Sequence, residues 1–294
     1  MLMKTPYKIL IITSSFLALN LLAKALSGNF EESDLIPPST KDLTLNKPES
    51  FSVESVLDQK FYFLAKGHQA IVFTSADGKH VLKLLKLHYP QISLPGVSFH
   101  FTHIPFAKSL YKLLFKEKLQ GRINKDFISY TNALEKFQEE SLVSYIHLAE
   151  SSHLDKRIQC YDKRGTLHVF SADKTCFLIQ ENVPSLQGTL KQFLFENKIK
   201  EAKIVLQNLV TLINLRASLH FYRPTHKFYA NFGCVGLKPI QYDIGNLLRA
   251  EDLHLAAPEE KSIQFSFYKL KKWIEKDFPE LSSYIEELTK DTDC

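Results

Sequence analysis

Cysteine is scarce in this chain, and its spacing is unlike that of a metal site. The 294 residues include four cysteines, Cys160, Cys176, Cys234 and Cys294. They form no CxxC pair and show no histidine-rich spacing, so a zinc site is not expected. Cys160 and Cys176 flank a predicted hairpin and could pair across it in an exported protein. We favour the alternative that these residues are buried or surface thiols.

A dense basic block is also missing. The formal net charge is +5, with 37 lysines and arginines spread along the chain against 32 acidic residues. This distribution argues against an obligate nucleic-acid-binding protein. The composition, 45% hydrophobic and 23% charged, is that of a globular protein. The length suffices for one large domain or for one domain of two lobes.

The N-terminus has no apolar run of the ~20 residues that a membrane-spanning helix usually needs. Lys8 and Lys24 enclose an apolar run at residues 9–23. Positive charges, an apolar run and small residues at Ala23 and Ala25 are the layout of a secretory signal peptide. An uncleaved transmembrane anchor and a buried helix stay open as alternatives. We therefore expect an exported or membrane-associated protein.

Turn signals separate three β-rich runs in the first third of the chain. The runs lie at residues 61–64, 70–73 and 80–85, and Ala76-Asp-Gly78 supplies a turn signal before the third. The pattern predicts a three-stranded antiparallel meander. The polar, turn-rich stretch before it, residues 26–55, is expected to be a linker.

Helical periodicity dominates much of the rest. Residues 126–150 are expected to form one long helix, and an insertion near 87–125 contains a basic helical stretch that we expect to pack on its own domain. Further β-like stretches follow between 157 and 180, and a small hairpin is expected about Gly236. The remainder of 183–294 is mainly helical. Strands first, a long helix among them and then a helical half predict an α+β fold.

The first candidate site lies in the loop and strands of the meander. A loop that covers phosphates must bring backbone amides close to them, which favours small residues. Ala65, Gly67 and Ala70 have the spacing of the glycines in such a loop, although only one is glycine. Val72 occupies a position suited to covering an adenine ring. Lys83 follows on a strand, where its ammonium could meet phosphates.

The second candidate site is an amide and a carboxylate twelve residues apart. Asn231 precedes the expected hairpin and Asp243 follows it. A tight hairpin can bring the two together, and both supply hard oxygen atoms suited to Mg²⁺ bound with phosphates.

Taken in order, these motifs resemble the protein-kinase superfamily across about residues 61–250. The resemblance implies a two-lobe architecture with a small antiparallel β N-lobe and a minimal helical C-lobe. The domains expected from it are a signal peptide or anchor at 1–25, a linker at 26–55, an N-lobe at 56–182 and a reduced C-lobe at 183–294.

The same resemblance implies ATP and Mg²⁺ as cofactors. It assigns nucleotide binding to Ala65, Gly67, Ala70, Val72 and Lys83, with Glu140 or Glu139 as the helix glutamate that meets the lysine. It assigns metal binding to Asn231 and Asp243.

One departure from the kinase pattern concerns the catalytic base. Kinases carry an aspartate five residues before the catalytic-loop asparagine, and His226 stands there in this chain. It is only a weak candidate for a base, because a surface histidine fits the position better. We therefore expect a degenerate, pseudokinase-like binding or regulatory module with a protein partner. An active atypical phosphotransferase and an envelope or host-interaction protein unrelated to kinases are the alternatives.

Overall fold

The computed structural model describes most of the chain from residue 51 onward and shorter pieces before it. The residues described are 7, 12, 14–16, 19, 32–38, 44–46, 51–67, 69–87, 91–94, 97–100, 107–221, 227–245, 247–249, 251 and 260–290. They fold into two compact units, which are described separately. The first unit comprises Met1–Thr44, Ser52–Ile123 and His147–Leu178, and the second Leu45–Phe51, Asn124–Ile146 and Ile179–Cys294.

Most strands lie before residue 182 and most of the later elements are helices, which confirms the expected α+β class. Up to residue 123 they are η1 (Glu32–Asp34), β1 (Thr44–Asn46), α2 (Val53–Leu57), β2 (Lys60–Lys66), β3 (Ala70–Ser75), β4 (His80–Leu85), β5 (Gln91–Leu94), β6 (Val97–His100), α3 (Ala107–Leu114) and the start of α4 (Lys116–Lys136). Then follow α5 (Gln138–Ser141), β7 (Val143–His147), β8 (Arg157–Tyr161), β9 (Leu167–Ser171), η3 (Ala172–Lys174) and β10 (Phe177–Glu181). The C-terminal part contains α6 (Leu186–Phe195), α7 (Ile199–Ser218), α8 (Phe228–Asn231), β11 (Phe232–Val235), β12 (Lys238–Gln241), α9 (Glu260–Asp277), η5 (Pro279–Leu281) and α10 (Ser282–Leu288).

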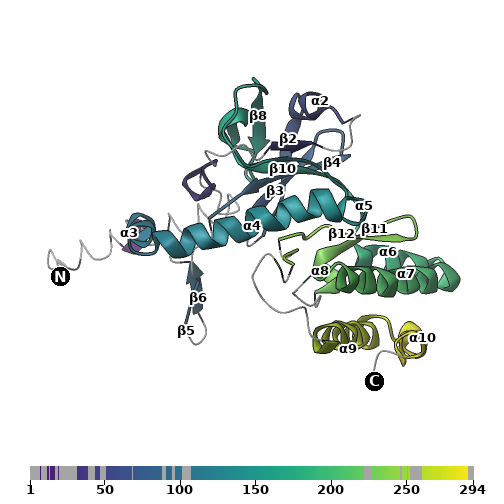
Figure 1. The fold of residues 1–294 in the computed structure, drawn as a ribbon. Helices are drawn as coiled ribbons and strands as arrows, with labels where there is room; N and C mark the ends of the chain where they lie inside the picture. The colour runs from purple at the N-terminus through teal and green to yellow at the C-terminus, as the bar shows by residue number, and fades with distance from the viewer. Residues whose placement is uncertain are drawn as a thin grey trace. The chain divides into compact units, whose positions relative to one another are not determined.

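A mixed sheet forms the centre of the first unit (Figure 1). Five consecutive strands of this eight-stranded sheet lie in the order β4-β3-β2-β8-β9. β2, β3 and β4 pair antiparallel, which confirms the meander, whereas β8 joins β2 in parallel and pairs antiparallel with β9. The apolar side chains of one face form the core, which includes Phe61, Ile71, Phe73, Leu82 and Leu84.

Local turn chemistry fixes the register of β3 and β4. The Asp77 carboxylate accepts hydrogen bonds from the Ser75 hydroxyl at 2.6 Å and the Lys79 amide at 3.0 Å. Gly78 has a φ of +71°, a conformation that favours glycine. The Gly78 amide also donates to the Ser75 carbonyl at 2.9 Å. The Asp-Gly pair in the sequence therefore forms the tight turn that it predicts.

Part of the range expected as a linker packs along β4. Ile36 is buried, and its amide donates to the Leu85 carbonyl at 2.9 Å. The Leu87 amide donates in turn to the Asp34 carbonyl at 2.6 Å. Residues 34–36 thus contribute both backbone hydrogen bonds and an apolar side chain to the first unit.

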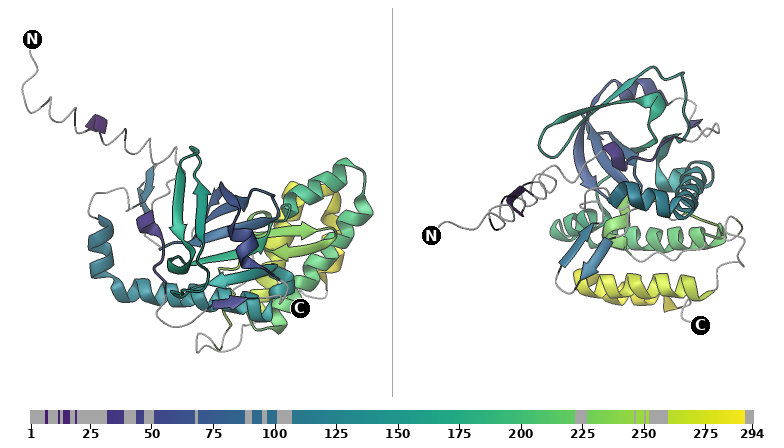
Figure 2. Two further views of the ribbon diagram at one scale, coloured as in Figure 1. Left: turned by 90° about the horizontal axis from the view of Figure 1, so that it is seen from above. Right: turned by 90° about the vertical axis from the view of Figure 1, so that its left-hand side faces the viewer.

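The second unit is mainly helical, and the small β11–β12 hairpin lies beside α6 and α7 (Figures 1 and 2). Gly236, with a φ of +58°, forms its turn, so the hairpin predicted about this glycine is confirmed. The Asn208 side chain of α7 donates to the Leu237 carbonyl at 3.0 Å. Trp273 of α9 stacks on Phe228 of α8 at 6.1 Å between ring centroids, which ties α9 into the same core.

The single helix expected at 126–150 is wrong at both ends. α4 begins at Lys116, and Leu142 ends the helical stretch in a left-handed conformation with φ of +54°. Residues 143–147 form the buried strand β7, and the Glu181 amide of β10 donates to the Leu142 carbonyl at 3.1 Å. Pairing with a distant strand overrides the local apolar spacing that suggested a helix.

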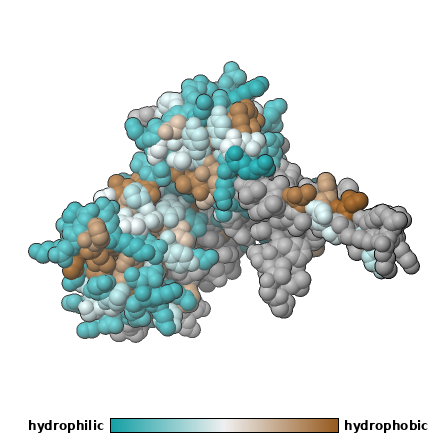
Figure 3. Space-filling view, turned by 180° about the vertical axis from the view of Figure 1, so that it is seen from behind, coloured by the Kyte–Doolittle hydropathy of each residue, from teal (hydrophilic) through white to brown (hydrophobic). Residues whose placement is uncertain are grey.

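The expectation of a transmembrane segment is corrected. Within the ranges given above, no helix is both long and apolar enough to cross a membrane. The three cysteines in the described part, Cys160, Cys176 and Cys234, are buried thiols, as we favoured from the sequence. Most of the described surface seen in Figure 3 is hydrophilic, with small groups of apolar residues.

Candidate functional site

The β11–β12 hairpin brings Asn231 and Asp243 together in the second unit. Phe232 pairs with Gln241 at the open end of the hairpin, so Asn231 lies one residue and Asp243 two residues beyond this last pair. The Asn231 carbonyl accepts the amides of Tyr242 at 3.1 Å and of Asp243 at 3.2 Å. Both side chains are partly exposed. The twelve-residue spacing thus corresponds to direct backbone contact between the two predicted metal ligands.

Gly233 allows this hairpin to approach the segment before α6. The Cys234 amide donates to the Pro184 carbonyl at 2.9 Å. A Cβ atom on Gly233 would lie 2.5 Å from a Val183 methyl carbon and 2.6 Å from the Pro184 carbonyl oxygen. Only glycine fits such a close approach without a shift of the backbone. Gly233 therefore has a packing role next to Asn231.

The C-terminal part of α4 holds the chain that follows Asp243. The buried Ser129 hydroxyl donates to the Ile244 carbonyl and accepts from the Leu247 amide, each at 2.6 Å. The Asn132 amide group donates to the Leu247 carbonyl at 2.9 Å. Two polar side chains of α4 thus hold the backbone of Ile244 and Leu247 in place. This support was not predicted, because the pairing spans more than a hundred residues.

A buried arginine that sequence analysis missed lies close to this junction. Arg216 of α7 donates to the side-chain oxygen of Gln241, whose amide group donates to the Asp243 carbonyl at 2.9 Å. Burial lowers the pKa of Arg216 to about 10, and the negative charge of Asp243 acts in the opposite direction. The guanidinium therefore remains charged at neutral pH. An arginine on the apolar face of α7 was the available signal.

Glu139 and Glu140, the glutamates expected to meet Lys83, lie close to a different lysine. Glu139 and Glu140 lie on α5, and a carboxylate oxygen of each is 4.0 Å from the ammonium of Lys238 on β12. The buried acid of the helical stretch is Asp126 on α4. After burial, Asp126 and Asp243 are the next causes that raise the pKa of Tyr130. Sequence analysis missed Asp126, although its four-residue spacing from Tyr130 places both on one helix face.

In the first unit, three of the predicted nucleotide-binding residues form a row across the sheet. Val72 of β3 pairs with Ala65 of β2 on one side and with Lys83 of β4 on the other. Lys83 is half-buried. The Gly67 amide donates to the Ala70 carbonyl at 2.9 Å, which closes the loop between β2 and β3. The predicted nucleotide-binding residues therefore all lie either in the loop between β2 and β3 or in this row of paired residues across the sheet.

The oxygen atoms of Asn231 and Asp243 are the candidate metal ligands of the second unit. Mg²⁺ prefers hard oxygen ligands, and one or two protein side chains suffice when phosphate and water complete its shell. The donor set therefore fits Mg²⁺ held together with a phosphate. Among the described residues, no group of three or more His, Cys, Asp or Glu side chains is arranged to hold a metal by itself. His226 lies outside the described residues.

Comparisons of this chain with protein-family models, with curated proteins and with solved structures found no match.

Proposed function

We propose that this chain is a degenerate kinase-like binding module that retains a place for a Mg²⁺-bound phosphate. The observation that carries the proposal is the junction of Asn231 and Asp243, joined by the 3.2 Å backbone hydrogen bond. The kinase-like two-lobe architecture is part of the proposal. Its support is the row of Ala65, Val72 and Lys83 in an antiparallel meander, together with the α+β class.

In this proposal the two side chains bind the metal and the protein behind them fixes their positions. A bound Mg²⁺ would neutralise charge on the phosphates. Ser129 restrains the backbone just after Asp243, and Gln241 restrains the Asp243 carbonyl itself. The positive charge of the buried Arg216 interacts favourably with the negative charge of Asp243. The backbone of Asp243 is therefore held in place without the ligand, and the Gly245 amide donates to its carboxylate at 3.5 Å.

The missing proton acceptor argues for binding over catalysis. From residue 202 to residue 242 the sequence contains no aspartate or glutamate. A kinase of the usual kind takes the proton of the substrate hydroxyl with an aspartate in this region. A domain that holds nucleotide weakly and acts through a protein partner is the function that these residues support best. Export through residues 1–25 remains a prediction from the sequence.

Thermal denaturation of the full chain with and without Mg²⁺-ATP tests the nucleotide part. At about ten times the Kd we expect the ligand to raise Tm by about 2–5 °C. Asn231→Ala, Asp243→Asn and Lys83→Ala should each abolish this rise, whereas Glu196→Gln on the exposed end of α6 should keep it. Each variant is compared with its own ligand-free Tm, because Asp243 also opposes the charge of Arg216. An unchanged Tm in the wild type would reject nucleotide binding.

An active phosphotransferase is the second candidate, favoured by the retention of Lys83, Asn231 and Asp243 together. Phosphoryl transfer depends mostly on positioning and charge, so a missing base need not abolish it. Incubation with Mg²⁺ and ATP labelled at the γ-phosphate should then label the chain or a protein added to it. Loss of labelling in Asp243→Asn, but not in Glu196→Gln, would support the enzyme. Absence of any labelling would favour the binding module.

A further inference from the structure

The outer face of the strands β2, β8 and β9 in the first unit is unusually apolar. Tyr62 pairs with Tyr161, and Tyr161 pairs with Leu167. The next step of the sheet aligns Lys60, Gln159 and Val169. Alternation along the strands adds Arg157 and Ser171 to these six side chains, which makes eight on this face.

The apolar members of this outer face are exposed. Tyr62, Leu167 and Val169 each have an exposed fraction of 45%. The rings of Tyr62 and Tyr161 stack at 5.4 Å between centroids, and the Lys60 ammonium lies 6.0 Å from the Tyr161 centroid. The solvated face of a sheet normally carries polar residues. Contiguous exposed apolar side chains instead mark a surface that binds another molecule.

β9 is the last strand in the order of this sheet, so one of its edges is open among the described strands. The Asp162 amide donates to the Thr166 carbonyl and the Ala172 amide to the Lys156 carbonyl, each at 2.9 Å. Because hydrogen-bonded pairs alternate in an antiparallel ladder, the backbone groups of residues 168 and 170 face β8. Those of Leu167, Val169 and Ser171 therefore point to the open edge.

This edge lacks the devices that usually prevent strand addition. Proteins protect an edge strand with lysine, proline or a bulge. β9 reads Leu-His-Val-Phe-Ser, and its pairing with β8 has no register shift. An extended peptide could add to such an edge through main-chain hydrogen bonds while alternate side chains contact the neighbouring face.

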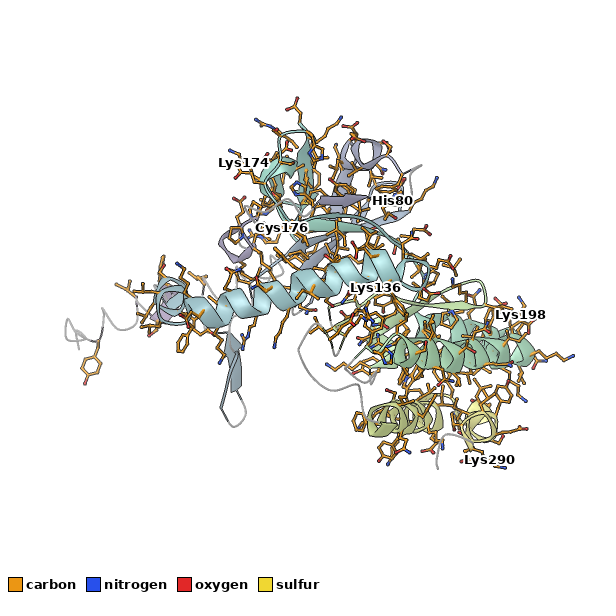
Figure 4. All side chains as sticks on the ribbon, in the orientation of Figure 1. His80, Lys136, Lys174, Cys176, Lys198 and Lys290 are labelled. Atoms are coloured by element: carbon orange, nitrogen blue, oxygen red, sulfur yellow. The ribbon has the colours of Figure 1, made fainter. Side chains whose placement is uncertain are left out.

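The charges around the outer face indicate the chemistry of the peptide. Its eight side chains include the cations Lys60 and Arg157 and no acid. Lys163 and Arg164 are exposed in the turn before β9, and Lys174 projects just after it (Figure 4). The one acid of that turn, Asp162, is buried, and its carboxylate accepts the amides of Arg164 at 2.8 Å and Thr166 at 2.9 Å.

We propose that the open edge of β9 and the outer face beside it bind an extended peptide segment of a partner protein, with apolar residues at alternate positions in its middle and acidic residues at its ends. Main-chain groups of the peptide pair with the open edge at Leu167 and Val169. Its apolar side chains lie beside these two residues on the outer face, and the carboxylates at its ends meet the exposed cations before and after β9, namely Lys163, Arg164 and Lys174.

A second copy of the chain fits this surface less well. Antiparallel pairing of two β9 strands would bring the turn with Lys163 and Arg164 of one copy near Lys174 of the other, because these cations lie at opposite ends of β9. Like charges that lie close together repel each other. The charge pattern therefore favours an acidic partner over self-association. This inference names the partner chemistry for the binding role proposed above, but it does not involve the nucleotide.

Fluorescence anisotropy of labelled six-residue peptides with the full chain provides the test. We expect the peptide Glu-Val-Thr-Val-Thr-Glu to bind at least ten-fold more tightly than Lys-Val-Thr-Val-Thr-Lys. The difference should shrink in 0.5 M salt, because salt screens exposed charges. Equal affinity for both peptides, or binding of neither, would overturn the proposal. No nucleotide is added, so this test and the Mg²⁺-ATP test can fail independently.

Two matched pairs of variants locate the binding. Val169→Pro removes an amide that points to the open edge without touching the ladder with β8, and it should weaken binding at least ten-fold, whereas Val169→Thr should not. Arg164→Glu combined with Lys174→Glu should abolish the preference for the acidic peptide, whereas Lys191→Glu on α6 should not. Circular dichroism checks that each variant is folded. Unaltered binding by Val169→Pro, or a dimer in light scattering that the same change disrupts, would contradict the proposal.

Discussion

At the scale of single residues, Lys86 shows how burial changes the charge balance of the first unit. It follows β4, and its amide donates to the Gln69 carbonyl at 2.9 Å. Burial is the main cause that lowers the pKa of this lysine to about 8, and the charge of Lys66 lowers it further. The nearby negative charge of Asp34 has the opposite effect. The folded state therefore binds the Lys86 proton less tightly than the unfolded chain does.

This difference predicts a pH dependence of stability. Between about pH 8 and the ordinary lysine pKa of 10.5, the unfolded chain holds more protons at this position, so the free energy of unfolding rises with pH. The contribution is fully present above pH 10.5 and is lost as the pH falls through about 8. Its upper limit is about 3 kcal/mol.

Urea unfolding at intervals from pH 7.5 to 10 measures this contribution as the difference between the wild type and Lys86→Met. We expect the free energy of unfolding of Lys86→Met to lack the part of the rise with pH that comes from Lys86. Lys191→Met, at an exposed position on α6, serves as the control and should follow the wild type. Parallel curves for the wild type and Lys86→Met would show that the pKa of Lys86 is not lowered.

At the scale of elements, α4 has a more important role than its sequence suggests. Its periodicity predicts an amphipathic helix. Its polar residues Ser129 and Asn132 also hold the backbone of Ile244 and Leu247 through hydrogen bonds in the second unit. A serine in a helix more often bonds to its own backbone. Here the Ser129 hydroxyl forms hydrogen bonds with two backbone groups of a distant segment, the Ile244 carbonyl and the Leu247 amide. Removal of the hydroxyl would leave both groups without this partner.

Ser129→Ala is therefore expected to destabilise the protein by about 2–4 kcal/mol, because it leaves the Ile244 carbonyl and the Leu247 amide without their partner. Ser218→Ala at the exposed end of α7 removes one local hydrogen bond and should cost less than about 1 kcal/mol. Urea unfolding of both variants measures the difference. Equal stabilities would mean that Ser129 does not support the segment after Asp243.

At the scale of the whole molecule, the two units are not two consecutive pieces of the sequence. The second unit takes Asn124–Ile146 from the middle of the chain and joins it to Ile179–Cys294. The first unit receives His147–Leu178 in between. The C-terminal part therefore depends on α4, which is separated from it in the sequence by β7, β8, β9 and β10.

This interleaving predicts that Ile179–Cys294 does not fold cooperatively by itself. Without α4 it lacks Ser129 and Asn132, and the apolar residues that pack on the helix become exposed. A fragment in which residues 124–146 are joined to residue 179 by a short Gly-Ser linker should regain a cooperative thermal transition by circular dichroism. A cooperative transition of the shorter fragment alone would contradict the prediction.

Local chemistry made much of the fold predictable. The Asp77-Gly78 and Gly236 turns, the β-rich runs beside them and the periodicity of α7 are short-range patterns, and the structure contains each of them. The spacing of Asn231 and Asp243 belongs to this class, because one hairpin joins the two residues. The long helix at 126–150 failed because its last part pairs with a strand more than thirty residues away.

The sequence by itself determined the α+β class, the meander and the hairpin that joins Asn231 to Asp243, since turn residues and side-chain periodicity act over a few residues. Only the tertiary structure revealed the support of Asp243 by Arg216, Gln241 and Ser129, and the open edge of β9. Burial and pairing between distant segments decide these features, and neither quantity is encoded in the local pattern of one strand or helix.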